Sequence, residues 1–407
     1  MKRIVITGMG AITPVGIGVD AYWNNITNGV SGIDIIKSFD PSELAVQIAG
    51  EVKDFTPSDY LPKDLIRKTD PFMQYAYIAA EEAVKQSGIT IEPERTGIVM
   101  GTAMSGVATT AFTQDALSSA ANKKVGPRFI PKILGNIAAA NIAIDYNIQG
   151  PSFTVSTACS SGGDAINTAM MCMQSGKADV MLAVGAESVL CPLVIYSLAN
   201  AKALSRRNDD PKTASRPFDV TRDGFVIGEG GGALVLETEE HALARGAKIL
   251  AELKGCGNTC DAHHVTAPHP EGRGAIACMK LALAEANLKP SDIGYVNAHG
   301  TATHKGDTVE TNAIKTLFGD TLPIVSSTKG ATGHMMGAGG VTETITCIKA
   351  IETGIVPPTI NLNEVDPECA GIDFAPNTAK KATIDYAMSN AFGFGGQNSS
   401  IIVGRYK

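Results

Sequence analysis

The chain has 407 residues, of which 44% are hydrophobic and 18% charged, and its formal net charge is −7. This is the composition of a folded globular protein that is long enough for two domains, or for two halves sharing one core. The acidic balance argues against a nucleic-acid-binding protein, which would need a surplus of basic residues.

Short apolar, β-branched runs alternate along the chain with longer stretches of helical periodicity. The predicted strands cover residues 4–7, 96–100, 152–156, 180–186, 233–237, 249–255, 293–298, 324–327 and 400–404. The predicted helices cover residues 73–86, 162–175, 241–245, 274–286, 308–317 and 339–353. This alternation predicts α/β layers around buried sheets.

Neither a secretion signal nor a membrane span is expected. The first residues continue directly into a strand and lack the apolar core of a signal peptide. Residues 180–201 form the most membrane-like window, but Glu187 and Pro192 interrupt it, so we predict a buried strand followed by a core helix. The 8 cysteines show no CxxC pair and indicate free thiols in a reducing cytoplasm.

Two segments of the first half of the chain have weak counterparts in the second half. The paired segments are residues 97–102 with 294–301, and residues 155–159 with 325–329. Each copy is a strand, a polar turn and a helix. We therefore expect two duplicated halves, residues 1–247 and 248–407, whose loops meet on one face and form a site there.

Cys159 is the strongest candidate nucleophile. It follows the predicted strand 152–156, and small residues at 160–163 lead into an apolar helix. A thiol at a helix N-terminus lies at the positive end of the dipole, which favours the thiolate. A lone cysteine is usually a structural core residue. This strand–turn–helix context instead predicts a nucleophile elbow.

Two histidines lie in glycine-rich surroundings at predicted strand ends. His299 follows the strand 293–298, and His334 lies in the glycine-rich run 328–340. One such histidine is most often a hydrogen-bonded loop residue. Two of them, together with an elbow cysteine, predict a Cys-His-His catalytic site.

Three motifs resemble the signatures of the elongating beta-ketoacyl-acyl carrier protein synthases, most closely type II. They are residues 157–162, 297–303 and 329–334, and further similarity extends from residues 4–10 to residues 390–396, through 215–219 and 222–225. The resemblance implies an α/β, thiolase-like fold in which two pseudo-duplicated halves form a layered α-β-α-β-α core. The half 1–247 would carry the nucleophile, and the half 248–407 would carry both histidines.

The resemblance also implies the reaction. Cys159 would take an acyl group from the phosphopantetheine of acyl carrier protein. Malonyl-acyl carrier protein would then lose carbon dioxide, and the resulting enolate would attack the acyl-cysteine to give a 3-ketoacyl chain two carbons longer. The implied protein is a homodimer that binds acyl carrier protein, needs no metal or redox cofactor, and contacts neither nucleic acid nor membrane.

Roles follow for the residues of the three motifs and of the closing loop. The backbone N–H groups of Cys159 and Phe394 would hold the oxyanion of acyl transfer, and the aromatic ring of Phe394, flanked by glycines, would gate the acyl pocket. His299 and His334 would donate to the malonyl thioester oxygen, where negative charge develops during decarboxylation.

The remaining implied roles are electrostatic support and substrate binding. Lys329, with Glu343 as its partner, would support the site electrostatically. Thr301 and Thr303 would hydrogen-bond the pantetheine arm, and Met104 would line the acyl tunnel. An ordinary surface ion pair and simple turn chemistry are the plainer interpretations of these residues.

Basic residues interrupt the acidic total in several places. Solvated surface charge is the default interpretation of any one cluster. Acyl carrier proteins are acidic, so a basic rim near the tunnel mouth would steer them toward it. The best candidates for this rim are Arg67, Lys68, Arg128 and Arg207.

Cysteines and histidines also gather between residues 256 and 269. Cys256, Cys260, His263, His264 and His269 offer possible zinc ligands, but their spacing matches no common zinc site. The corresponding stretch of the family is a metal-free loop near the active site. We therefore expect no metal here.

Several related classes compete with this interpretation. A thiolase would need a second catalytic cysteine near the C-terminus, where residues 392–396 contain none. A non-catalytic chain-length partner would lack Cys159, and a cysteine hydrolase would not explain His334 and Lys329. A discrete type II polyketide ketosynthase would use the same site and stays open as the alternative.

Overall fold

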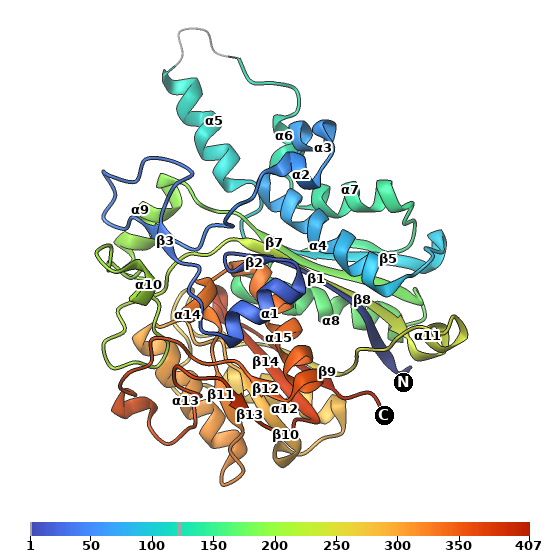
Figure 1. Ribbon diagram of the computed structural model, residues 1–407, viewed down its shortest axis with the longest axis vertical. Coiled ribbons are helices and arrows are strands. Elements are labelled where there is room, and N and C mark those ends of the chain that lie inside the picture. Colours follow the sequence, from blue (N-terminus) through green and yellow to red (C-terminus); the bar gives the residue numbers. More distant parts are fainter. Residues whose placement is uncertain (1, 120–123) are drawn as a thin grey trace.

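The computed structural model describes residues 2–119 and 124–407, and most of its strands join in one mixed sheet (Figure 1). The strand order is β11-β10-β14-β15-β9-β1-β8-β7-β5-β6, and β2 pairs with β1 beside this path. These strands are β1 (Ile4–Thr13), β2 (Gly16–Ile17), β5 (Thr96–Gly101), β6 (Ser152–Val155), β7 (Val180–Glu187), β8 (Gly230–Thr238), β9 (Ala251–Cys260), β10 (Ile293–Asn297), β11 (Ile324–Ser326), β14 (Tyr386–Gly393) and β15 (Gln397–Gly404).

The helices lie on both faces of this sheet, and some lie between its first part (β1, β8, β7, β5 and β6) and its second part (β9, β15, β14, β10 and β11). They are α1 (Val19–Thr27), α2 (Pro57–Tyr60), α3 (Lys63–Lys68), α4 (Pro71–Ser87), α5 (Val107–Ser119), α6 (Phe129–Ile133), α7 (Asn136–Tyr146), α8 (Ser161–Gln174), α9 (Pro192–Asn200), α10 (Pro211–Ala214), α11 (Glu239–Ala244), α12 (Arg273–Ala286), α13 (His304–Phe318), α14 (Lys329–Thr332) and α15 (Gly339–Thr353). Two further sheets have two antiparallel strands each. One pairs β3 (Asp34–Ile35) with β4 (Ile48–Ala49), and the other pairs β12 (Ile355–Val356) with β13 (Lys380–Lys381).

The sheet and helices form the expected α-β-α-β-α layers. Helices α4 and α7 pack on the outer face of β1, β8, β7 and β5, and α12 covers the opposite side of the molecule over β9 and β15, with α13 packed beside α12 (Figure 1). Helices α8 and α15 contact each other between these two halves of the sheet. The layered α/β core predicted from the sequence is therefore confirmed.

Strand β7 shows why its sequence is apolar without interruption. Val180, Leu182 and Val184 pack in the outer core cluster with α4, whereas Met181 and Ala183 pack in the central cluster with α8 and α15. A strand covered by helices on both faces has no polar face. The window that looked membrane-like is thus a buried strand followed by α9, as predicted, and no helix in the described residues is long and apolar enough to span a membrane.

The strand order has an internal symmetry. Outward from the junction of β1 with β9, the order β1-β8-β7-β5-β6 on one side mirrors β9-β15-β14-β10-β11 on the other. Parallel pairing of β5 with β6 and β7 is matched by parallel pairing of β10 with β11 and β14. The paired segments noted in the sequence lie on, or directly after, these equivalent strands. The exact division at residues 247 and 248 stays a prediction.

The two central helices begin with their backbones in direct contact. A Cβ atom on Gly162 of α8 would lie 2.7 Å from the carbonyl oxygen of Gly337, and one on Gly340 of α15 would lie 2.3 Å from the backbone nitrogen of Gly163. Any side chain at these points would collide with backbone. These glycines therefore bring the N-terminus of α8, next to Cys159, against the segment that follows His334.

The strands and helices predicted from the sequence are all present, although β1 and β9 extend further than expected. Among the longer elements, β14 and the helices α1, α5 and α7 were not predicted. Strand β14 carries the buried polar residues Ser389 and Asn390, and Asn390 accepts a hydrogen bond of 2.8 Å from Ser400 on the neighbouring strand. Buried polar residues that are satisfied across the sheet interrupt the apolar run by which a buried strand is recognised.

Candidate active site

Cys159 lies in a tight turn between β6 and α8. A single 3-10 turn, Ala158–Ser160, connects the two elements, and Ala158 has a φ of 51°. This left-handed conformation is unusual for a residue with a Cβ. It is supported by Ser161, whose hydroxyl donates to the carbonyl of Ala158 at 2.6 Å and accepts from the N–H of Thr157 at 2.9 Å. The predicted elbow is therefore present.

Asp164, in the first turn of α8, hydrogen-bonds both to this elbow and to β9 in the second half of the chain. Its carboxylate accepts hydrogen bonds from the hydroxyls of Thr157 at 2.6 Å and Ser160 at 3.1 Å, and from the amide of Asn258 on β9 at 2.7 Å. The residue is buried. The sequence analysis did not single out Asp164, although an acidic residue in the first turn of the helix behind the nucleophile was a usable signal.

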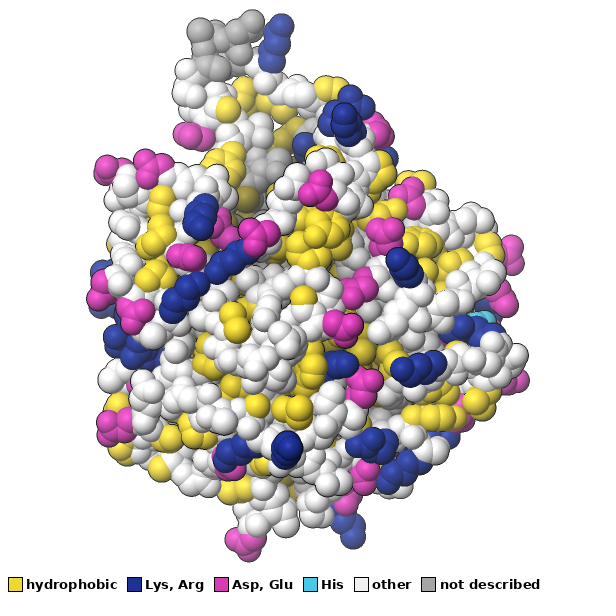
Figure 2. All heavy atoms as spheres, viewed as in Figure 1, with side chains coloured by type: hydrophobic (Ala, Val, Ile, Leu, Met, Phe, Trp, Pro, Cys, Tyr) yellow, Lys and Arg dark blue, Asp and Glu magenta, His cyan; other side chains and the backbone are white. Residues whose placement is uncertain are grey.

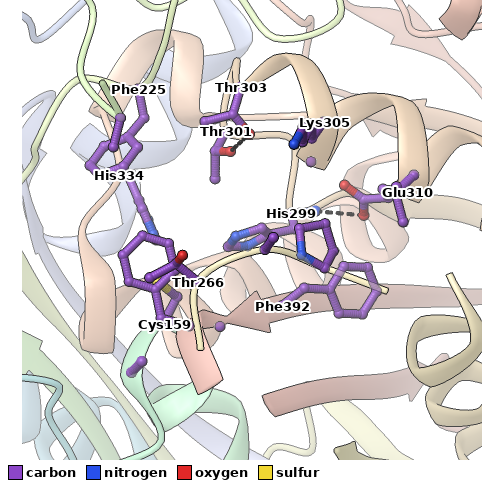
Figure 3. Close-up of a pocket in the computed structure, with 18 of the residues that line it drawn as sticks. Cys159, Phe225, Thr266, His299, Thr301, Thr303, Lys305, Glu310, His334 and Phe392 are labelled. Atoms are coloured by element: carbon purple, nitrogen blue, oxygen red, sulfur yellow. Dashed lines mark hydrogen bonds between the residues drawn. The ribbon is translucent and has the colours of Figure 1, made fainter. Parts of the chain in front are cut away.

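The structure brings the two histidines and the cysteine together (Figure 3). The Sγ atom of Cys159 and one ring nitrogen each of His299 and His334 all lie within 4.8 Å of one another, and all three residues are buried. The imidazole rings meet edge to face, with centroids 5.3 Å apart and planes at 87°. Because Cys159 follows β6 while His299 follows β10 and His334 follows α14, both halves supply the site.

Both imidazoles are neutral. Burial lowers the pKa of His299 and of His334 well below the usual value, and the positive charge of Lys329 acts in the same direction. The Nδ1 atom of His299 and both ring nitrogens of His334 lack a hydrogen-bond partner within the described part of the protein. A neutral imidazole has one N–H to donate, so each ring can stabilise an anionic oxygen placed between them.

The thiol of Cys159 is protonated, contrary to the expectation from the helix dipole. Burial raises its pKa to about 11, and this effect outweighs the hydrogen bond from the backbone N–H of Phe394 and the charge of Lys329, which both lower it. The positive end of α8 therefore does not by itself produce a thiolate. The two N–H groups predicted for the oxyanion, those of Cys159 and Phe394, do adjoin the sulfur.

Lys329 and Glu343 form a buried ion pair, as the sequence predicted. Their side chains are only 2% and 4% exposed, and the ammonium donates directly to the carboxylate. Burial raises the pKa of Glu343, and the charge of Lys329 opposes this. An ordinary surface pair is thereby excluded.

Two further carboxylates, absent from the sequence prediction, hold the loops around the site. Glu310 on α13 accepts from the backbone N–H groups of His299 and Gly300, each at 2.8 Å, as drawn for His299 in Figure 3. Glu187 at the end of β7 accepts from the hydroxyl of Thr102 at 3.0 Å and from the backbone of residues 103, 104 and 337. Burial raises the pKa of each carboxyl to about 7.

A largely apolar cavity of about 890 Å³ opens beside Cys159. Thr301 and Thr303, whose hydroxyls are 3.1 Å apart, lie on one side of it (Figure 3), and Met104 also lines it. Phe394 also lines it and is 40% exposed. Gly395 and Gly396 behind it have φ values of 85° and 73°, which favour glycine. The residues expected to contact substrate therefore share one cavity.

The basic residues proposed for carrier-protein binding do not line this cavity. Arg67 is exposed and Lys68 is half-buried on α3, and they face Asp64 at 3.0 and 3.6 Å. Arg128 is exposed at the start of α6. Arg207 donates to the carbonyl of Thr221 at 2.8 Å. Figure 2 shows Lys and Arg side chains gathered over α3, and this surface stays a prediction for carrier binding.

The cysteine- and histidine-rich stretch does not converge on one point. Cys256 is buried, whereas Cys260 is exposed. His264 accepts at Nδ1 from the backbone of residues 266 and 267, and His269 accepts at Nδ1 from residue 271. These nitrogens support turns of the loop. In the described ranges, the one grouping suited to a metal is that of Cys159, His299 and His334.

The layered fold and the Cys-His-His cluster define a condensing enzyme of the thiolase-like fold. The family described as "Beta-ketoacyl synthase, N-terminal domain" matches residues 1–242, and "Beta-ketoacyl synthase, C-terminal domain" matches residues 250–363. The chain belongs to the beta-ketoacyl synthase family.

Similar proteins of known sequence agree over the full length. The chain is 42% identical to a 3-oxoacyl-[acyl-carrier-protein] synthase 2 of Synechocystis, covering 100% of this chain and 99% of the relative. It is 43% identical to the protein of the same name from Coxiella burnetii, covering 99% of each. The predicted resemblance of this chain to the elongating beta-ketoacyl synthases, most closely type II, is confirmed.

Solved structures show the same fold. The ishigamide ketosynthase/chain length factor superposes with a TM-score of 0.94 at 34% identity, covering all of both chains. A beta-ketoacyl synthase from Burkholderia phymatum superposes with a TM-score of 0.91 at 35% identity, again with full coverage. A type II polyketide ketosynthase, solved in complex with its acyl-carrier protein, superposes with a TM-score of 0.90 at 32% identity.

Proposed function

We propose that the protein elongates a fatty acyl chain by decarboxylative Claisen condensation with malonyl-acyl carrier protein. The observation that carries this proposal is the convergence of a buried thiol with two neutral imidazoles beside one largely apolar cavity. The thiol supplies a nucleophile for acyl transfer. The two imidazoles supply hydrogen-bond donors for the oxygen that becomes anionic during decarboxylation.

In the first half-reaction, Sγ of Cys159 attacks the thioester carbonyl of the acyl carrier. The Sγ–C bond forms, the bond to the pantetheine sulfur breaks, and the thiol proton passes to that sulfur. The N–H groups of Cys159 and Phe394 adjoin Sγ and would hold the tetrahedral oxyanion. The charge of Lys329, which lowers the pKa of Cys159, also favours negative charge at this point.

In the second half-reaction, malonyl-acyl carrier protein enters the vacated site. The malonyl thioester loses carbon dioxide, and its oxygen accepts hydrogen bonds from His299 and His334 as the enolate forms. The enolate carbon attacks the acyl-cysteine carbonyl, the C–Sγ bond breaks, and the released thiolate of Cys159 takes a proton from water. Each uncharged imidazole keeps one N–H group, and this group donates to the oxygen. No cofactor takes part in this scheme.

The cavity provides places for the rest of the substrate. Thr301 and Thr303 lie where an arm leading to Cys159 would pass, and their hydroxyls would hydrogen-bond the pantetheine amides. Met104 would border the acyl chain, and its flexible side chain would yield to different chain lengths. Phe394 would move with the glycines beside it to admit the acyl group. Arg67, Lys68, Arg128 and Arg207 would steer the acidic carrier.

We infer a homodimer from the edge of the main sheet. Strand β6 ends the sheet, and no strand of the described residues pairs with its outer edge. Phe153 on β6 is 46% exposed and Ile144 on the neighbouring α7 is 75% exposed. An uncovered edge strand with apolar neighbours is a surface for pairing with a second copy. Pairing there would place the acyl pocket close to the interface, because the β6 turn carries Cys159.

The free state of all eight cysteines supports a cytoplasmic location. A discrete type II polyketide ketosynthase is the second candidate function, because one of the similar solved structures is a type II polyketide ketosynthase. That function would use the same residues. Products of more than one condensation without reduction between them would favour it.

The test is mass spectrometry of the intact protein. Wild type and Cys159→Ala are incubated with acyl carriers of several chain lengths and then with malonyl-acyl carrier protein. We expect an acyl adduct on wild type only, which malonyl carrier discharges as a 3-ketoacyl chain two carbons longer. No adduct at any chain length would refute the proposal and would favour a coenzyme A substrate or a partner-subunit role.

A further inference from the structure

The three residues of the active site also have the chemistry and placement of a zinc site. A cysteine sulfur and one nitrogen from each of two histidines lie within 4.8 Å of one another. Cysteine and histidine are the preferred zinc ligands, with bonds of about 2.3 Å to sulfur and about 2.0–2.1 Å to nitrogen. Ligand atoms around a tetrahedral zinc are therefore about 3.3–3.6 Å apart, a separation that lies inside the 4.8 Å limit within which the three atoms are found here.

The imidazoles are unusually available as ligands. His299 Nδ1 and both ring nitrogens of His334 lack hydrogen-bond partners in the described residues, although both residues are more than nine-tenths buried. Buried polar atoms without partners are rare and costly. A metal ion would supply the missing partner for a nitrogen lone pair.

We propose that Cys159, His299 and His334 bind one zinc ion, and that this ion inhibits the enzyme reversibly. The inhibitory consequence rests on the proposed function; the binding itself does not. As the Sγ–Zn bond forms, the thiol proton leaves to solvent, and each imidazole binds through a lone pair. The fourth position faces the cavity and takes water or a small thiolate. The zinc-bound sulfur is then no longer free to attack a thioester.

The charges that face this cluster permit a cation. The positive group nearby is Lys329, whose charge is felt at Cys159 and at both histidines. It is held in an ion pair by Glu343. The carboxyl of Glu187 also faces Cys159 and opposes the charge of Lys329 there.

The stretch from Cys256 to His269 is the natural competitor for zinc. His264 and His269 already accept backbone hydrogen bonds at Nδ1, and Cys256 is buried away from the exposed Cys260. The rings of His263 and His269 nevertheless lie near the surface with centroids 5.0 Å apart and planes at 57°. Cys260→Ala is therefore the matched control for zinc binding, because it removes an exposed thiol from the competing stretch and leaves all three proposed ligands in place.

The test is zinc binding measured without any acyl substrate, by calorimetry and native mass spectrometry with zinc chloride. We expect one ion per chain in wild type and in Cys260→Ala. In Cys159→Ala and His334→Ala the affinity should fall by more than the about 10–100-fold typical of losing an outer hydrogen-bond partner. Wild type whose Cys159 has been alkylated should lose binding equally, which separates ligand loss from misfolding of a variant.

Unchanged affinity in alkylated wild type, or a loss confined to Cys260→Ala, would overturn the inference and assign any zinc to the exposed stretch. In a separate assay with acyl and malonyl carriers, zinc should stop condensation and a chelator should restore it. Binding without any condensation would refute the proposed function and leave the zinc site standing. Condensation without zinc binding would refute the zinc site and support the proposed function.

Discussion

The ammonium of Lys329 donates to the carboxylate of Glu343 in the protein interior, and the pair joins the start of α14 to the first turns of α15. His334 lies between these two helices in the chain. A buried ion pair tolerates the loss of both partners far better than the loss of one, which leaves an uncompensated charge. The pair therefore has separable effects on stability and on chemistry.

Replacing Lys329 alone should destabilise the protein strongly. Lys329→Met leaves Glu343 buried without its partner, and we expect a loss of about 3–5 kcal/mol in the free energy of unfolding. The double variant Lys329→Met/Glu343→Leu should recover most of this stability but not condensation, because the cation that favours charge at Cys159 is still missing. Denaturant unfolding and product formation check both parts. Full recovery of activity in the double variant would contradict an electrostatic role for Lys329.

Removing one imidazole donor should separate decarboxylation from acyl transfer. In His334→Ala the malonyl oxygen loses one of two donors, so we expect carbon dioxide release to slow by about 10²–10³-fold. Loading of Cys159 with an acyl group should continue, since its oxyanion is held by backbone N–H groups. Carbon dioxide release and the acyl adduct are measured on the same samples. His263→Ala in the exposed loop is the control and should behave as wild type. If His334→Ala slowed carbon dioxide release and acyl loading equally, its role would not be confined to decarboxylation.

Reactivity of Cys159 should increase with pH far into the alkaline range. Because burial raises the pKa of its thiol to about 11, the thiolate is a small fraction at neutral pH, and its alkylation rate should rise about tenfold per pH unit between pH 7 and 10. Iodoacetamide labelling, corrected with Cys159→Ala, measures this rate. A plateau near pH 8 would show a thiolate stabilised in the resting enzyme.

The same raised pKa of the Cys159 thiol stabilises the fold below pH 9, and this contribution to the free energy of unfolding is lost as the pH rises toward 11.

The hydrogen bonds of Asp164 should affect the nucleophile through the shape of its turn. Asp164→Ala removes the common acceptor of Thr157, Ser160 and Asn258, and a displacement of about 1 Å would slow acyl loading about 100-fold. Asp164→Asn keeps one acceptor oxygen, so we expect its rate of acyl loading to lie between those of wild type and Asp164→Ala. Acylation and alkylation rates are compared at matched folded fractions. Asp115→Ala on the exposed α5 is the control, and wild-type loading in Asp164→Ala would remove this role.

A charge on the free sheet edge should disrupt the proposed dimer. Phe153→Lys places an ammonium on β6, where a second copy would have to bury it, so we expect monomers in analytical ultracentrifugation. Leu243 on α11 is 57% exposed and lies away from β6, so Leu243→Lys is the matched control. Dimers that persist in Phe153→Lys would place the interface elsewhere.

Much of the site was predictable because its residues sit at strand ends with glycine beside them. Cys159, His299 and His334 were all identified, and β5 with β10 showed the internal repeat. The protonation of the thiol was not predictable, because it depends on how completely the folded chain buries the sulfur. Partners distant in sequence were hidden for a similar reason. Asp164 meets Asn258 only after β9 has been placed against β15 and α8.

The glycine contacts between α8 and α15 determine how ligands must enter and leave. Backbones that touch at Gly162, Gly163, Gly337 and Gly340 leave no layer of side chains to repack, and hinge or shear motion requires a deformable interface. Relative motion of the halves is therefore restricted at these contacts, and under the gating role proposed for Phe394, access would depend on the dihedral angles of the turn Phe394–Gly396. For an inhibitor, residence time would be set by this short turn, so compounds that lock its conformation should dissociate slowly whatever their total contact area.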